Sequence, residues 1–429
     1  MSCSPLTSSS PLKLRLSFSS QRKKLVLCRF PRAEAALAAA GLPRVVLHDS
    51  LDTAGIDTRF ARAARESFCQ QVGKLSGIDL ESSITISRGA DLAKAALHIA
   101  AEDDSLVSHS SVPLPVDAFI DRLDDLSMGF CSLYLPPSNA APEVFFGNLE
   151  RYFYVHKGFR RVDITSDSKA LYLHSVLTCR SGSAIMLSLI YSEMLKSLRI
   201  CGFLDFDAEI YFPHDFVGLP RGYQKQKSKM SDQPDIMTSK SLLVEVLRNL
   251  KDAFWPFQYD HSSSLFLRAA HAANHIYGSS IEGERNSKSD SNVSALEIAS
   301  AKAAQHRIER GVWTTVCFGD MRRALAACER LIFLDIDFRE LRDYAILLYH
   351  CGLYEECSQC LKSYETAKSC SPCPKSRSDQ VREELEEDAV ENLKARLNLI
   401  LGEEGWSKRK IGASYGGCNL EPCTEWMGC

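Results

Sequence analysis

Three side chains that can together perform nucleophilic catalysis lie in the middle of the chain: the thiol of Cys179, the imidazole of His214 and the carboxylate of Asp215. A thiol attacks an acyl carbon once a histidine has taken its proton, and a carboxylate orients that histidine. Asp207 is an alternative orienting group. These residue types therefore allow a cysteine-dependent acyl-transfer or peptidase site, provided that the fold brings them together.

A turn and a buried helix must position the thiol. Residues 179–183 have the composition of a turn, and residues 184–198 predict a helix because apolar side chains recur at three- and four-residue spacing. A thiolate is stabilised at a helix N-terminus, where backbone N–H groups are free. Cys179 precedes the turn glycine, Gly182, so we expect it to lie outside the first turn of this helix. Arg180 is expected to brace the turn or to pair with an acid.

The composition is that of an ordinary soluble protein with more than one domain. The chain has 429 residues, of which 45% are hydrophobic and 24% charged, with a net charge of −3. This balance does not favour nucleic acid or an anionic membrane as the main partner, and no apolar run has the length of a membrane span. The 16 cysteines are scattered, so we expect most to be reduced and buried. The oligomeric state cannot be derived.

Residues 1–33 have the composition of an organelle transit peptide. The first acidic residue is Glu34, and the segment before it is rich in serine and basic residues without a long apolar core. We expect import into the chloroplast stroma. A mitochondrial signal is the second choice, and a merely disordered tail is the remaining alternative.

Helical spacing continues on both sides of the turn. Helices are expected before it and after it, over residues 57–74, 90–101, 116–128, 143–156, 169–177, 241–254 and 264–276. Residues 219–239 are polar and predict an exposed loop, and residues 279–294 predict a linker.

A weak repeat occurs in the C-terminal part. Gly319 and Gly352 are 33 positions apart, and Ala324 and Cys357 have the same separation. This spacing is close to the period, roughly 34 residues, of the tetratricopeptide helix–turn–helix repeat. Helical repeats of this kind bind extended peptides or partner helices, so they suggest a protein partner. An ordinary helical bundle is the alternative.

The C-terminal tail contains cysteines with the spacing of zinc ligands. Cys370 and Cys373 are separated by two residues, and Cys418 and Cys423 follow. A helix predicted over residues 382–400 would hold the two pairs far apart. We therefore predict no metal and no cofactor, with a structural zinc site as an alternative.

Together these segments resemble the SirB-type family, in which a transglutaminase-like domain precedes tetratricopeptide-like helices. The resemblance covers residues 84–364. Residues 177–185, Leu-Thr-Cys-Arg-Ser-Gly-Ser-Ala-Ile, are similar to the signature Leu-x-x-Arg-x-Gly-x-Pro-Ile of that family. Residues 212–216 look like its Pro-Gly-His-Phe segment, and Arg342-Asp343, with the Leu-Leu-Tyr that follows, looks like part of its repeat region.

The resemblance implies a domain without its nucleophile. Transglutaminase-like enzymes carry the nucleophile two residues after the turn glycine, where this chain has Ala184 and the SirB-type family usually has proline. The family's Gly-His-Phe is replaced by His214-Asp215-Phe216, at the end of a strand predicted over residues 206–212. A shift of one residue along a strand reverses the side-chain direction, so His214 is expected to point away from the ancestral site and Asp215 into it.

We therefore predict an α+β fold, mostly α, in which a transglutaminase-like domain with a small antiparallel sheet is followed by tetratricopeptide-like helical hairpins. We expect a transit peptide (residues 1–33), an N-terminal helical segment (34–83) and the transglutaminase-like domain (84–223). A polar loop with helices and a linker (224–294), the repeats (295–365) and a mostly disordered tail with one helix (366–429) follow.

The predicted function is non-catalytic protein binding or scaffolding. The turn region would contribute Arg180, Gly182 and Tyr191, and the repeats would contribute Arg342 and Asp343. The alternative is a divergent cysteine-dependent enzyme that uses Cys179 as nucleophile, His214 as base and Asp215 as orienting group.

Overall fold

A computed structural model describes the chain in eleven stretches, residues 46–76, 91–108, 112–137, 140–164, 167–213, 218–224, 238–257, 264–278, 319–334, 336–370 and 377–402. These stretches are mostly helical and contain one antiparallel and one parallel pair of short strands. The predicted class, α+β and mostly α with a small antiparallel sheet, is confirmed. The predicted transit peptide and the linker at 279–294 lie outside the described residues. Within the eleven stretches, no helix is both long and apolar enough to cross a bilayer.

Three helices precede the turn region. They are α2 (Leu47–Thr53), α3 (Arg59–Ser76) and α4 (Leu92–Ser108), and α3 packs along α4. α4 continues well beyond residue 101, where the sequence predicted its end. The acidic run that begins at Glu102 looks like an exposed helix end, but Glu102 and Asp103 are buried and paired. The prediction was wrong because the partners of these acids lie far away in the sequence.

The helix α8 (Ala184–Ile200) is the centre of the next part of the fold. Nearly every residue of its first three turns is buried, as expected for a helix that is apolar on all sides. It packs against α4, the long α5 (Val116–Leu133), α7 (Leu173–Cys179) and α9 (Ser239–Ala253).

Two predicted helices are each divided into two elements. The first consists of α6 (Pro142–Glu150) and a π-helical segment, η1 (Arg151–His156). The second consists of a 3₁₀ turn, η2 (Ser168–Leu171), followed by α7, and the side chain of Asp167 caps η2. The break before α7 falls at Tyr172, whose backbone is extended and whose hydroxyl donates to Asp103 at 2.8 Å.

The antiparallel sheet consists of β3 (Ala208–Tyr211) and β4 (Arg221–Gln224), with Ala208 opposite Gln224. β4 lies in the segment predicted to be a loop, so that prediction was wrong at its start. The strand fits because Gly222 is buried beside Phe146, where an added Cβ would lie 2.2 Å from a ring carbon. Polar composition alone did not indicate this packing.

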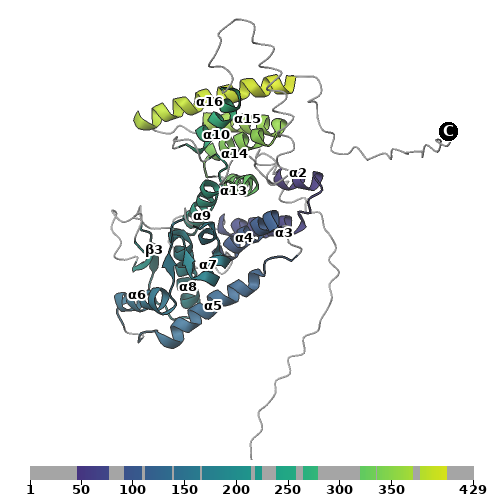
Figure 1. Ribbon diagram of the computed structural model, residues 1–429. Helices are drawn as coiled ribbons and strands as arrows, with labels where there is room; N and C mark the ends of the chain where they lie inside the picture. The colour runs from purple at the N-terminus through teal and green to yellow at the C-terminus, as the bar shows by residue number, and fades with distance from the viewer. Residues whose placement is uncertain are drawn as a thin grey trace, which may run out of the picture.

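The C-terminal helices pack in sequence order. α13 (Met321–Phe333) contacts α14 (Arg339–His350), α14 contacts α15 (Tyr354–Cys370), and α15 contacts α16 (Arg377–Gly402). The starts of α13 and α15, Met321 and Tyr354, are 33 positions apart, in agreement with the spacing in the sequence. α9 covers α13, and α10 (Leu265–Gly278) packs on α14 and α16. Figure 1 shows these helices on one side of α3 and α4, with α5, α6 and β3 on the other.

Candidate functional site

The turn between α7 and α8 combines a left-handed residue with a short pair of parallel strands. Arg180, which follows the last residue of α7, has left-handed dihedrals of φ 56° and ψ 25°. Ser181 and Gly182 form β2, which pairs in parallel with β1 (Arg160–Arg161). A non-glycine residue in this left-handed region costs roughly 1 kcal/mol. The local chain therefore accepts strain at Arg180.

Gly182 is required at its position by close packing. It is buried, and a Cβ added there would lie 2.6 Å from Cγ1 of Val176 in α7. The carbonyl oxygen of Gly182 accepts from the N–H of Val162 at 2.9 Å. Gly182 was predicted to contribute to binding, and its visible role is to let the turn pass α7; the binding role remains a prediction.

The N-terminus of α8 carries no thiol. Ala184 is its first residue and is 7% exposed. The preceding Ser183 caps the helix, because its hydroxyl accepts from the N–H of Met186 at 3.3 Å. Cys179 is exposed and is the last residue of α7, on the other side of the turn. The prediction that Cys179 lies outside the first turn of α8 is confirmed.

The other two members of the predicted catalytic set, His214 and Asp215, lie outside the described residues, which stop at Pro213 after β3. Their distance from Cys179 and the directions of their side chains remain predictions. Asp207, the alternative orienting group, pairs at the surface with Arg199 at 2.7 Å. No pair of the predicted catalytic groups is thus brought together within the described residues.

Comparison with known proteins gives a family match, and it covers the part of the chain that contains this turn. Residues 117–217 match the model of the Transglutaminase-like superfamily. They form a transglutaminase-like domain. The match covers α5 to β3, including the turn and α8. No curated protein and no solved structure gave a significant match to the chain.

Tyr191, predicted to bind a partner, lies inside the transglutaminase-like domain. It is fully buried in α8, and its ring packs edge-on against Phe153 at 5.9 Å between centroids. Burial, followed by the nearby Glu150 carboxylate, raises the pKa of Tyr191 well above its ordinary value. Its observed contribution is to the core, and a contact with a partner remains a prediction.

Glu193, two residues further along α8, is a buried acid that was not among the predicted site residues. Its carboxylate lies 3.1 Å from the ammonium of Lys196. Burial raises the pKa of Glu193 to about 7, although Lys196 acts in the opposite direction. The carboxyl is therefore an internal group whose charge changes near neutral pH.

The raised pKa of Glu193 predicts a loss of stability with increasing pH. Between its ordinary value of 4.5 and about 7, the folded chain holds a proton that the unfolded chain has released. The free energy of unfolding should therefore decrease between about pH 5 and pH 8. Glu193→Gln should be more stable than the wild type by about 1–3 kcal/mol at the higher pH and nearly equal at the lower. Urea unfolding at both pH values measures the effect.

Glu245→Gln, which changes a half-buried glutamate of α9, is the control for this experiment. A stability gain of the Glu193→Gln variant that is the same at both pH values would contradict the prediction, because it would show that the gain does not depend on ionisation.

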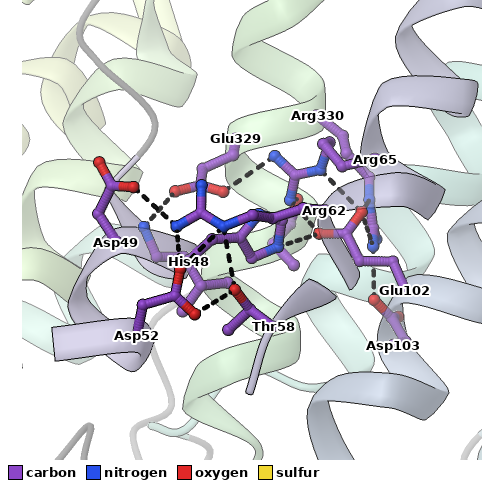
Figure 2. Close-up of polar contacts among 12 residues, drawn as sticks. His48, Asp49, Asp52, Thr58, Arg62, Arg65, Glu102, Asp103, Glu329 and Arg330 are labelled. Atoms are coloured by element: carbon purple, nitrogen blue, oxygen red, sulfur yellow. Dashed lines mark hydrogen bonds and ion pairs between the residues drawn. The ribbon is translucent and has the colours of Figure 1, made fainter. Parts of the chain in front are cut away.

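A buried charged network lies where α2, α3, α4 and α13 meet (Figure 2), and the sequence gave no indication of it. At its centre, Glu102 accepts two hydrogen bonds from Arg65, at 2.6 and 2.7 Å, and one from Arg330 at 3.2 Å. His48 lies 3.0 Å from the same carboxylate. Asp103 pairs with Arg330 at 2.6 Å. Both acids and Arg330 are almost completely buried.

Glu329 closes this network from the side of α13. Its carboxylate accepts from Arg65 at 2.9 Å, from the N–H of Leu47 at 3.1 Å and from the hydroxyl of Tyr344 at 2.7 Å. Burial raises the pKa of Glu102, but Arg330 and Arg65 outweigh it and hold that pKa well below its ordinary value. The network therefore keeps its central carboxylate ionised inside the protein and connects the N-terminal helices to α13 and α14.

A second buried network holds the residues predicted to bind through the repeats. Lys251 of α9 donates to Glu340 at 2.6 Å and to Asp343 at 2.9 Å. Arg342 donates to Asp343 and, at 2.5 Å, to Glu386 of α16. Arg342 and Asp343 are thus covered by α9 and α16, and their observed contacts are internal. A direct contact with a partner remains a prediction.

The predicted zinc ligands are largely outside the described residues. Cys370 ends α15, whereas Cys373, Cys418 and Cys423 fall in undescribed stretches. Among the described residues no cluster of histidine, cysteine and acidic side chains has metal-binding geometry. Cys328, Cys351, Cys357 and Cys360 are free thiols buried among the C-terminal helices.

Proposed function

We propose that this protein is a non-catalytic transglutaminase-like protein that binds a protein partner. The observation that carries the proposal is Ala184 at the first position of α8, where enzymes that the chain resembles hold their nucleophile. Its methyl group cannot attack an acyl carbon. The adjacent Ser183 hydroxyl is engaged as the helix cap, and Cys179 lies across the turn from the free N–H groups of α8.

The finer assignment within the superfamily is the SirB-type family, with α13 to α15 in the tetratricopeptide-like repeats and α16 as the helix that follows them. The spacing of 33 positions between the starts of α13 and α15 and the packing of successive helices support it. Helical repeats usually act by binding other proteins, so this assignment agrees with a scaffold role.

We also propose that the protein works in the chloroplast stroma. The acid-free, serine-rich and basic composition of residues 1–33 supports this location. A reporter protein fused to these residues should enter plastids, and its exclusion from plastids would contradict the proposal.

The non-catalytic role predicts an ordinary thiol at Cys179. Cys201, the exposed cysteine that caps the other end of α8, is a matched control in the same chain. Neither thiol lies at a helix N-terminus, so the two should be alkylated by iodoacetamide at similar rates, both at about pH 6 and at about pH 8. Mass spectrometry of the full chain after timed labelling measures both rates.

The competing enzymatic function requires a different result. A Cys179 that is labelled at about pH 6 at least tenfold faster than Cys201 would be an activated nucleophile. Acyl transfer that is present in the wild type and lost in Cys179→Ser would likewise overturn the non-catalytic proposal. If the full chain captures no plastid protein, the proposal that it binds a protein partner is contradicted.

A further inference from the structure

Four cationic side chains surround the turn of the transglutaminase-like domain: Arg122, Lys157, Arg160 and Arg180, together called the turn surface. The three arginines are exposed and Lys157 is half-buried. Arg180 donates to the carbonyl of Lys157 at 3.0 Å, and Arg160 donates to the hydroxyl of Ser181 at 2.8 Å. Arg122 donates to the hydroxyl of Thr178 at 3.2 Å. Thr178, Ser181 and the carbonyl of Lys157 therefore orient the three arginine side chains at the turn.

None of these four cations pairs with a carboxylate among the residues that the structure describes. The hydrogen bonds of the three arginines go to neutral oxygens, and the Lys157 ammonium lies 5.3 Å from the centroid of the Tyr152 ring. Arg199, an arginine of the same domain, pairs with Asp207 at 2.7 Å. Each guanidinium of the turn surface uses one N–H group for its neutral partner and keeps others for a ligand. The neutral contacts thus orient the cations without neutralising their charge.

Part of the turn surface comes from a segment rich in positive charge, whereas Arg122 lies next to Asp121 in α5. Residues 151–161 contain four arginine and lysine residues and no acid, in a chain whose net charge is −3. Arg180 also occupies the left-handed backbone region, with φ 56°, where glycine would be less strained. The exposed guanidinium of Arg180 makes a hydrogen bond to the backbone of Lys157, and the retention of a large cationic side chain at a strained position supports a role in binding.

We propose that the turn surface binds a short acidic segment of a protein partner; this inference rests on the proposed function and specifies the partner's chemistry. Arginine forks bind carboxylates through two parallel hydrogen bonds, and this geometry suits Asp and Glu side chains. Nucleic acid fits less well, because such binding usually engages about 6–10 phosphates, more than four cations can neutralise. The negative net charge of the chain also disfavours a long polyanion.

The test uses the full chain and a fluorescent twelve-residue peptide of alternating Glu and Ser. Arg160→Gln combined with Arg180→Gln should weaken peptide binding by about two- to twentyfold, since each exposed ion pair contributes about 1.4- to fivefold. Added salt should weaken wild-type binding and reduce this difference. The control, Arg248→Gln with Lys362→Gln, removes two exposed charges of α9 and α15 and should bind as the wild type does.

A second variant separates binding from folding. Arg180→Gly relieves the left-handed strain, so its thermal midpoint should equal or exceed that of the wild type, while its peptide affinity should decrease. If the glycine variant and the double variant both bind the peptide with unchanged affinity, the proposal that the turn surface binds acidic segments is wrong. Equal weakening by the control pair would also overturn it, because the attraction would then be a general charge effect.

Three further results decide the class of ligand. A peptide of Gln and Ser should not bind, and a single-stranded oligonucleotide of equal charge should bind more weakly than the acidic peptide. Tighter binding of the oligonucleotide would overturn the proposal of a protein partner. Absence of peptide binding at about 1 mM peptide and low salt would overturn the inference of an acidic ligand. It would not show that Cys179 is a nucleophile, so failure of this inference can be distinguished from failure of the proposed non-catalytic function.

Discussion

Glu102→Ala is expected to lower the free energy of unfolding by about 3–5 kcal/mol, because it leaves buried cations without their central carboxylate. Glu102 is completely buried and lies within hydrogen-bond distance of Arg65, Arg330 and His48. After the substitution, Arg65 retains Glu329 and Arg330 retains Asp103, but the N–H groups that donated to Glu102 lose their acceptor inside the protein. Urea unfolding followed by circular dichroism measures the loss.

The matched control for this prediction lies at the edge of the same group of helices (Figure 2). Asp52 pairs with Arg62 at 2.5 Å, and both side chains are well exposed. Asp52→Ala should change stability by no more than about 1 kcal/mol, because water solvates the remaining charge. A Glu102→Ala variant that is as stable as Asp52→Ala would show that the buried network does not contribute as the contacts indicate.

The second large effect is expected from cutting the chain. A polypeptide limited to residues 117–217, the segment that matches the superfamily, should not form a folded domain. The apolar surface of α8 is covered by α4 and α9, and both helices lie outside this segment. Without them, part of the buried apolar surface of α8 would be exposed to water, and exposing each buried leucine costs about 1.5–3 kcal/mol.

Residues 46–402 provide the comparison for the cut chain, because they include α4, α9 and both charged networks. This longer polypeptide should unfold in one cooperative transition with a well-defined near-ultraviolet circular dichroism spectrum. A shorter segment that shows the same cooperative transition would contradict the prediction, because the turn and α8 would then need no support from the rest of the chain.

The sequence predicted correctly those elements whose formation depends on residues that are close together in the chain. The continuous apolar spacing of α8 and the turn at Gly182 were both found in the structure. β4 was missed because its polar composition does not reveal that Gly222 packs on Phe146. α4 was predicted too short because its acidic end is buried by Arg330, which lies far along the chain. These errors arise wherever a distant residue decides whether a polar or small side chain is buried.

In the candidate site, too, local features could be predicted from the sequence and long-range contacts could not. The position of Cys179 outside the first turn of α8 could be predicted because Cys179 precedes the turn glycine, Gly182, in the sequence. The paired and buried state of Arg342 was not predictable, because Glu386 lies 44 positions away and Lys251 acts through the neighbouring Asp343. A charge on an amphipathic helix does not reveal whether it faces solvent or another helix.

The buried charged network also restricts how the protein can be made. Arg65 is synthesised 37 positions before Glu102, but Arg330 follows Glu102 by 228 positions. During vectorial synthesis, the N-terminal helices therefore remain without their full set of counter-charges until most of the chain has left the ribosome. Such a chain completes its interior only late, and a truncated or stalled product leaves exposed the apolar surface that α13 would cover, which makes it a target for chaperones and proteases.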